Sequence, residues 1–138
     1  MSTHLKAKEE KILQILECLA EESARGIPII VEGKKDIETL QMLNVEGTII
    51  AAKTGGKTIL DTVSEIEKTR KKEAILMLDF DRRGKELTKR LAQYLEKTEI
   101  KANLMFWLNL SGIIGKEVKD VEGLASYMET LKSKTTNS

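Results

Sequence analysis

The chain has 138 residues, the length of one ordinary domain, and this is too short for two separate hydrophobic cores. Its 23 lysines and arginines nearly balance 22 aspartates and glutamates, so the net charge of +1 neither indicates nor excludes a nucleic-acid partner. No apolar run approaches the roughly 20 residues of a membrane span, and the first residues do not resemble a signal peptide. We therefore expect a cytoplasmic protein with one domain and no membrane association.

The first predicted element is a helix over residues 5–24, because apolar residues recur there at helical spacing: Ile12, Ile15, Leu16 and Leu19. The only cysteine, Cys18, has no partner for an internal disulfide, and its place in a helix favours a small buried apolar residue over a reactive thiol. We expect residues 1–26 to form a helical extension that ends at Gly26 and packs on the domain.

A strand, a short helix and a second strand follow. Residues 27–31 form an apolar strand with the only proline near its start, and Glu32 and Gly33 come directly after it. Asp36 is placed to cap a short helix that turns Ile37, Leu40 and Leu43 inward. The second strand is predicted over residues 48–52.

The alternation then continues to the end of the chain. A glycine-rich connection over residues 53–58 leads into a helix with Ile59, Val63 and Ile66 at helical spacing. Further elements are predicted in this order: a strand over 74–78, a helix after Gly84 with Leu87, Leu91 and Leu95 on one face, a fourth strand over 104–108, a loop over 109–119, a helix capped by Asp120 that runs to Leu131, and a frayed polar tail over 132–138.

This alternation of strands and helices predicts the fold class. Parallel strands need crossover connections, and these place helices on both faces of the sheet. We predict an α/β fold with a single Rossmann-like domain over residues 27–131 and about four mainly parallel strands. Ligands of such sheets bind beyond the carboxyl ends of the strands, so the predicted strand ends after residues 31, 52, 78 and 108 should converge on one site.

The stretch AILMLDFDRRG, residues 74–84, carries the strongest chemical signal. Its apolar half is typical of a strand covered on both faces, and Asp79 and Asp81 follow directly. Two neighbouring carboxylates repel each other, and a hard divalent cation relieves that repulsion, which predicts a site for Mg²⁺ with Mn²⁺ as a substitute. The alternative interpretation is a helix cap and a turn residue, two roles that aspartate often fills.

Glu32 lies at a second strand end, where its carboxylate can join the metal ligands or move a proton in phosphoryl transfer. The alternative is a solvated glutamate without a function. The predicted phosphate or nucleic-acid contacts surround this edge of the sheet: Gly33, Lys34, Lys35, Lys57, Arg82, Arg83 and Lys116. The two arginines have an alternative role, which is to neutralise the aspartates beside them.

The segment AAKTGGKT, residues 51–58, is similar to the end of a phosphate-binding P-loop at Gly56, Lys57 and Thr58, although Ala51 replaces the leading glycine. This interpretation predicts a nucleotide hydrolase in which Lys57 contacts phosphates. A glycine turn with exposed lysines explains the same residues without a ligand.

The stretches VEGKKD, residues 31–36, and LDFDRRG, residues 78–84, stand in the order of two known signature motifs, with one further predicted strand and helix between them. Together they resemble the Toprim domain, which is shared by type IA and type II topoisomerases, bacterial primases and ribosomal-RNA maturation ribonucleases. The resemblance covers about residues 27–131, and in size the chain is similar to small stand-alone Toprim proteins. It implies that Glu32 acts as general acid or base, with Gly33 as its turn partner, and that Asp79 and Asp81 hold magnesium.

Residues 116–122, KEVKDVE, are similar to a lysine- and acid-containing segment after the fourth strand of the small Toprim proteins. The nucleophilic tyrosine of topoisomerases comes from another domain, and Tyr94 and Tyr127 lie on predicted helices. We therefore predict a magnesium-dependent nuclease that acts on RNA or structured DNA. The alternatives are a non-catalytic nucleic-acid-binding or primase-related accessory module and a nucleotide hydrolase that uses residues 51–58. The sequence leaves protein partners undetermined.

Overall fold

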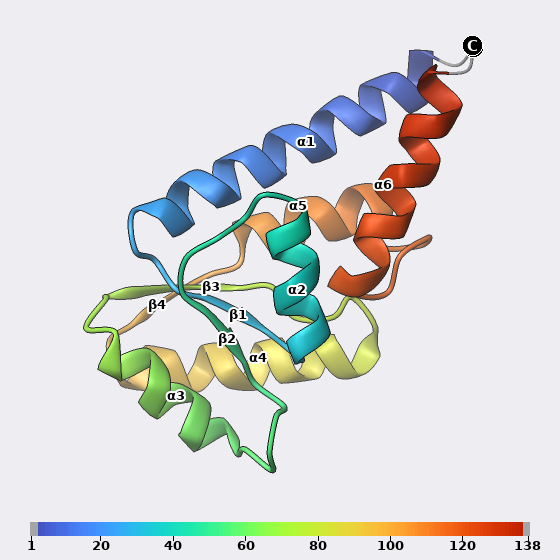
Figure 1. Ribbon diagram of the computed structural model, residues 1–138. Coiled ribbons are helices and arrows are strands. Elements are labelled where there is room, and N and C mark those ends of the chain that lie inside the picture. Colours follow the sequence, from blue (N-terminus) through green and yellow to red (C-terminus); the bar gives the residue numbers. More distant parts are fainter. Residues whose placement is uncertain (1–2, 137–138) are drawn as a thin grey trace.

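The computed structural model describes residues 3–136 and contains, within them, six helices and four strands (Figure 1). The helices are α1 (Thr3–Ala24), α2 (Lys34–Met42), α3 (Ile59–Lys68), α4 (Arg82–Lys97), α5 (Met105–Ile114) and α6 (Val121–Thr136). The strands are β1 (Ile29–Val31), β2 (Ile49–Ala51), β3 (Glu73–Leu76) and β4 (Lys101–Asn103).

The strands form one parallel sheet in the order β2-β1-β3-β4. Ile30 pairs with Ile50 on one side and with Leu76 on the other, so β1 and β3 occupy the centre of the sheet. Parallel pairing requires a crossover between strands, and helices supply it here. The predicted α/β class with four parallel strands is confirmed.

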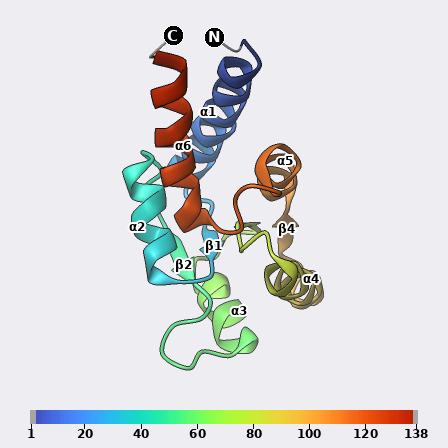
Figure 2. The same cartoon turned by 90° about the vertical axis from the view of Figure 1, so that its right-hand side faces the viewer.

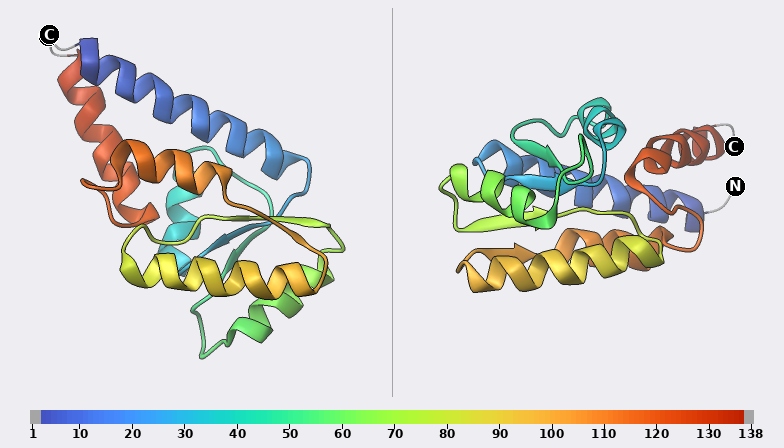
Figure 3. Two further views of the ribbon diagram at one scale, coloured as in Figure 1. Left: turned by 180° about the vertical axis from the view of Figure 1, so that it is seen from behind. Right: turned by 90° about the horizontal axis from the view of Figure 1, so that it is seen from below.

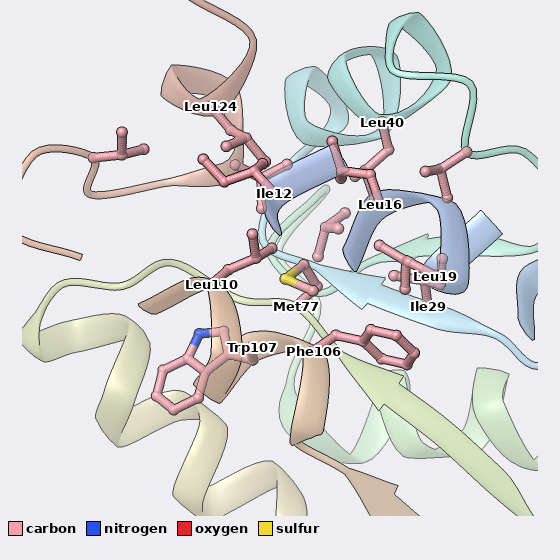
Figure 4. Packing of buried hydrophobic residues seen from close by; sticks show 14 of the residues in the cluster. Ile12, Leu16, Leu19, Ile29, Leu40, Met77, Phe106, Trp107, Leu110 and Leu124 are labelled. Atoms are coloured by element: carbon pink, nitrogen blue, oxygen red, sulfur yellow. The ribbon is translucent and has the colours of Figure 1, made fainter. Parts of the chain in front are cut away.

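Side chains alternate between the two faces of the sheet and enter two separate hydrophobic clusters. Ile29 and Val31 belong to the larger cluster, whereas Ile30 belongs to the smaller one. Helices α1, α2, α5 and α6 cover the larger cluster, and α3 and α4 cover the smaller one (Figures 1 and 2). Figure 4 shows the larger cluster, in which Met77 lies near Leu110 of α5. Each fully buried aliphatic side chain of this kind contributes about 1.5–3 kcal/mol.

The prediction of a fourth strand over residues 104–108 and of a loop over 109–119 is wrong. Most of these residues form α5, and the fourth strand is the short edge strand β4 that precedes it. A short apolar run such as LMFWL fits a buried helix as well as a buried strand. The helix forms because it packs between α1 and β3, which buries Phe106 and Trp107. The predicted strand end after residue 108 therefore does not exist.

Two features of the predicted extension and tail also differ from expectation. Cys18 is exposed, because α1 turns Ile12, Leu16 and Leu19 into the core and leaves Cys18 on another face of the helix. Within the expected tail, residues 132–136 continue α6, and residues 137 and 138 lie outside the described residues, as do residues 1 and 2 of the expected extension.

No helix within residues 3–136 combines the length and apolar character needed to cross a membrane.

Candidate metal and nucleic-acid site

Glu32 and Asp79 lie side by side at the carboxyl edge of the sheet. Each follows one of the two central strands, and the pairing of these strands continues past β3, where the Met77 amide donates to the Ile30 carbonyl over 2.8 Å. Both carboxylates line a pocket of about 350 Å³. The other lining residues are Gly33, Lys34, Lys35, Asp36, Lys53, Asp120 and Glu122.

One oxygen of each carboxylate has no hydrogen-bond partner. Glu32 Oε1 and Asp79 Oδ1 are buried and accept no hydrogen bond from any described residue. Buried polar atoms are nearly always paired, so these two facing oxygens require either a proton shared between Glu32 and Asp79, which raises the pKa of Asp79, or a bound cation. A hard divalent cation prefers carboxylate oxygens, so this pair fits the metal that the sequence predicts.

The protonation of Asp79 reflects the same crowding. Burial, together with the neighbouring Glu32 carboxyl, raises the pKa of Asp79 to about 8, and Asp36 and Asp120 add to the shift. Without a cation, the pocket therefore favours a neutral Asp79. A bound cation reverses this preference, because it stabilises the ionised carboxylate.

Lys53 is a site residue that the sequence reasoning missed. Its Nζ lies 3.6 Å from Glu32 Oε2, and its backbone amide donates to the Glu32 carbonyl over 2.8 Å. The side chain is half-exposed, so it partly neutralises Glu32 and remains within reach of a ligand. The signal that could have found it is its position, two residues after a strand that neighbours β1 in the sheet.

Asp36 ties the loop after β1 to the start of α6. Its two carboxylate oxygens accept hydrogen bonds from the amides of Gly33 (3.0 Å) and Glu122 (3.1 Å). Burial raises the pKa of Asp36, and these two amide hydrogen bonds oppose the shift. Asp120 caps α6 by accepting from the Gly123 amide over 2.7 Å. Asp36 is not the N-cap that the sequence suggests: α2 begins at Lys34 with Gly33 at its N-cap, and Asp36 accepts the Gly33 amide from the third position of the helix. Its link to α6 could not be predicted from the sequence.

Helix α5 and the segment before α6 hold Asp79 in place. The Trp107 indole nitrogen donates to the Leu78 carbonyl over 2.9 Å. The Phe80 amide donates to the Lys119 carbonyl over 2.6 Å, and the Phe80 ring stacks on Trp107 with centroids 6.4 Å apart. Both neighbours of Asp79 in the chain are thus anchored by residues that lie after β4.

Asp81 has a different environment from Asp79. Its Oδ1 accepts a hydrogen bond from the Gly84 amide over 2.8 Å and so caps the N-terminus of α4. It does not line the pocket that contains Glu32 and Asp79. At Gly84 a Cβ atom would lie 2.1 Å from the Asp79 carbonyl oxygen, so only glycine permits this approach of α4 to the end of the strand.

The described residues contain no cluster of three or more His, Cys, Asp or Glu side chains arranged for a metal ion. A magnesium ion commonly keeps several waters and uses one or two protein carboxylates. The Glu32 and Asp79 pair therefore suffices for such an ion, and Asp81 is available only if it exchanges its capping hydrogen bond for the metal.

The predicted cations divide into two groups. Lys34 and Lys35, at the start of α2, line the acidic pocket. Arg82 and Arg83 lie at the exposed start of α4, where Arg82 Nε is 3.6 Å from a carboxylate oxygen of Glu86. Lys116 lines a separate hollow beside Phe80. The arginines and Lys116 do not line the acidic pocket.

In the loop over residues 53–58, the Lys57 side chain points toward protein oxygens. Lys57 Nζ donates to the Ala51 carbonyl over 2.7 Å and forms an ion pair with Glu65. Thr58 caps α3 by accepting from the Asp61 amide over 3.2 Å. The predicted phosphate contact of Lys57 would require the loss of its present partners.

Comparison with known proteins agrees with this architecture. A family model described as the Toprim domain matches residues 27–107. A UPF0292 protein from Methanocaldococcus jannaschii is 42% identical over 120 residues, which cover 86% of this chain and 91% of the relative. A UPF0292 protein from Methanosarcina acetivorans is 38% identical over 126 residues, which cover 91% of this chain and 85% of the relative.

A solved structure of a putative protein from Aquifex aeolicus has a similar fold, with a TM-score of 0.66 and 23% identity over 80% of this chain and 94% of that one. Toprim domains typically bind divalent metal ions and serve nucleic-acid-related functions. From the matched family model and its two archaeal relatives it follows that the chain belongs to the Toprim family, together with the UPF0292 proteins.

Proposed function

We propose that this protein is a divalent-metal-dependent nuclease that hydrolyses phosphodiester bonds in RNA or structured DNA. The supporting observation is the pair of orphaned oxygens, Glu32 Oε1 and Asp79 Oδ1, in one pocket at the carboxyl edge of the sheet. Nucleic acid is the proposed partner, and the cytoplasm is the proposed location.

In this proposal Asp79 and Glu32 hold Mg²⁺, with Mn²⁺ as a substitute, and Asp81 joins them when it leaves the N-cap of α4. The metal, when bound, neutralises phosphate charge and lowers the pKa of a water molecule. Glu32 is the general acid or base: its carboxylate takes the proton of the attacking water or, once protonated, delivers a proton to the leaving oxygen. Lys53 offsets the charge of Glu32 when no substrate is present.

The cations along this edge bind the nucleic-acid backbone in the proposal. Lys34, Lys35 and Lys53 line the pocket and contact the phosphate nearest to the reacting bond. Arg82, Arg83 and Lys116 lie outside the pocket and contact more distant phosphates. Gly33 allows a phosphate to approach the backbone closely because it has no side chain; its amide N–H already donates a hydrogen bond to Asp36.

One observation favours a second candidate, a nucleic-acid-binding or primase-related accessory module without catalysis. Asp81 is engaged in helix capping, which leaves two carboxylates at the metal position. In this case the metal only bridges the protein to phosphates. The third alternative, a nucleotide hydrolase, is disfavoured by the contacts of Lys57 and predicts that Lys57→Ala abolishes ATP binding.

An activity screen separates these candidates. RNA, single-stranded DNA and duplex DNA are incubated with the protein and Mg²⁺, Mn²⁺ or a chelator. The nuclease proposal expects cleavage that requires the metal and disappears in Asp79→Asn. Asp61→Asn is the matched control, because it removes an exposed carboxylate on α3 and should leave cleavage unchanged. Binding without metal-dependent cleavage on all substrates would favour the accessory module.

A further inference from the structure

A groove between α1 and α5 lies away from the acidic pocket and has no role in the proposed function. Its volume is about 720 Å³, compared with about 350 Å³ for the acidic pocket, and no residue lines both. Figure 3 shows α1 and α5 running next to each other on the back of the molecule. The groove is therefore a surface on which a partner can bind without covering Glu32 and Asp79.

The outer face of α5 is unusually apolar for an exposed surface. The helix has the sequence MFWLNLSGII, which is apolar on almost every side, and such helices are normally buried all round. Its inner face enters the core, but Met105 and Leu108 are each 57% exposed and line the groove. A partner that covers this face would remove both side chains from water.

The α1 side of the groove carries charges that match those of a second α1 in the opposite direction. The α1 residues that line the groove are Lys11, Gln14, Ile15, Cys18, Glu21 and Glu22, and of these Lys11, Ile15, Cys18 and Glu22 recur at helical spacing on one face, with Glu21 adding a second carboxylate beside Glu22. Along the sequence, these four residues are arranged symmetrically: the point halfway between Lys11 and Glu22 is also halfway between Ile15 and Cys18. An antiparallel second α1 would therefore set Lys11 against the second copy's Glu22, and Ile15 against its Cys18. Two such ion pairs form at once, because a two-fold interface repeats every contact.

The present partners of these charges leave them free for this role. The ion pairs among residues 3–136 do not include Lys11. Glu22 forms one with Arg25 at 3.1 Å, but it is an exposed pair within a helix, which is a weak interaction. Gly112, at the α5 side of the groove, has open space where a Cβ would be, so nothing obstructs an approaching helix there.

We propose that the groove between α1 and α5 is the interface of a two-fold symmetric homodimer in which the two α1 helices pack antiparallel. A second copy is the occupant that the charges favour, because an unrelated cationic or anionic segment would match only one end of α1. The dimer leaves both acidic pockets open to nucleic acid.

Sedimentation equilibrium of the wild-type chain and of groove variants tests the apolar part of the interface. The wild type should dimerise at micromolar concentration, and Leu108→Lys should weaken the dimer at least about tenfold by placing a charge in an apolar contact. Leu60→Lys is the matched control, because Leu60 is an equally exposed leucine on α3 (61%) and should leave association unchanged. A wild type that stays monomeric, or equal effects of both variants, would overturn the proposal.

A charge exchange tests the antiparallel arrangement. Lys11→Glu and Glu22→Lys should each weaken self-association at least about tenfold, since each places like charges together at both ends of α1. An equimolar mixture of the two variants should restore dimers, because every contact then joins opposite charges. A mixture that stays monomeric, or variants that self-associate like the wild type, would exclude this interface. Circular dichroism of each variant verifies folding, and both side chains are largely outside the core.

Discussion

The indole nitrogen of Trp107 donates a hydrogen bond to the carbonyl oxygen of Leu78 over 2.9 Å, which ties α5 to the residue before Asp79. This contact links a helix on one face of the sheet to the acidic pocket at its edge. It also explains why a tryptophan, which needs a partner for its N–H group when buried, is accommodated in the core.

Trp107→Phe should lower the free energy of unfolding by about 1–3 kcal/mol, because the buried Leu78 carbonyl loses its donor. The variant should also bind magnesium more weakly, since Asp79 is less firmly placed. Urea denaturation and calorimetric metal titration measure the two effects. Tyr94→Phe, which removes one polar atom from a partly buried ring of α4, is the control and should change neither quantity. If Trp107→Phe unfolds and binds magnesium like the wild type, the Trp107 hydrogen bond neither stabilises the fold nor positions Asp79.

Asp79 should make the metal-free protein less stable as the pH rises. Its pKa is about 8 in the folded state, against an ordinary value of 3.8 in the unfolded chain. Between these two values the folded state retains a proton that the unfolded state has released, so the free energy of unfolding falls with increasing pH and levels off above the folded-state pKa. Asp79→Asn cannot titrate and should lack this decrease. The check is urea denaturation in chelator at stepped pH, and identical slopes in both proteins would contradict the prediction.

Asp81→Asn should weaken magnesium binding without changing stability. Asparagine caps a helix about as well as aspartate, so α4 keeps its N-cap while the charge is lost. Asp79→Asn should reduce the affinity further, because Asp79 lies in the pocket itself. Isothermal titration calorimetry measures both. If Asp81→Asn binds magnesium as well as the wild type, Asp81 is only a helix cap.

Much of the fold was predictable because it depends on local patterns. The strands predicted over residues 27–31, 48–52 and 74–78 stand out as apolar runs, and the helices between them show helical spacing of apolar residues. The closeness of Glu32 and Asp79 follows from the rule that parallel strands end at one edge of the sheet. The error at residues 104–108 has a physical cause. Helix α5 buries Phe106, Trp107, Leu110 and Ile114 on one face, but its exposed positions Met105 and Leu108 are apolar as well, so the sequence shows no amphipathic period.

The rest of the site depends on contacts between distant segments. The bond from Asp36 to the Glu122 amide and the approach of Lys53 to Glu32 join residues whose proximity only the folded chain defines. Only the position of Lys53, two residues after β2, distinguishes it from other exposed lysines. The capping hydrogen bond of Asp81 follows a common pattern, but the same residue also fits the metal motif, and the sequence leaves both roles open.

Arg82→Ala and Arg83→Ala should weaken nucleic-acid binding without a selective effect on cleavage. Both side chains are exposed at the start of α4 and outside the acidic pocket. The loss of a phosphate contact weakens binding across sequences and makes its salt dependence less steep, because fewer counterions are released. Fluorescence anisotropy at several salt concentrations measures both quantities. An unchanged salt slope in both variants would exclude these arginines from the interface.

Cleavage by Glu32→Gln, measured beside its affinity for the same substrate, tests the central claim most directly. Glutamine keeps the size of the side chain but cannot exchange a proton, so turnover should fall about a hundredfold or more while nucleic-acid affinity stays nearly unchanged. Metal-dependent cleavage at the wild-type rate in Glu32→Gln, or a wild-type protein that binds nucleic acid but never cleaves it, would contradict a nuclease in which Glu32 moves the proton.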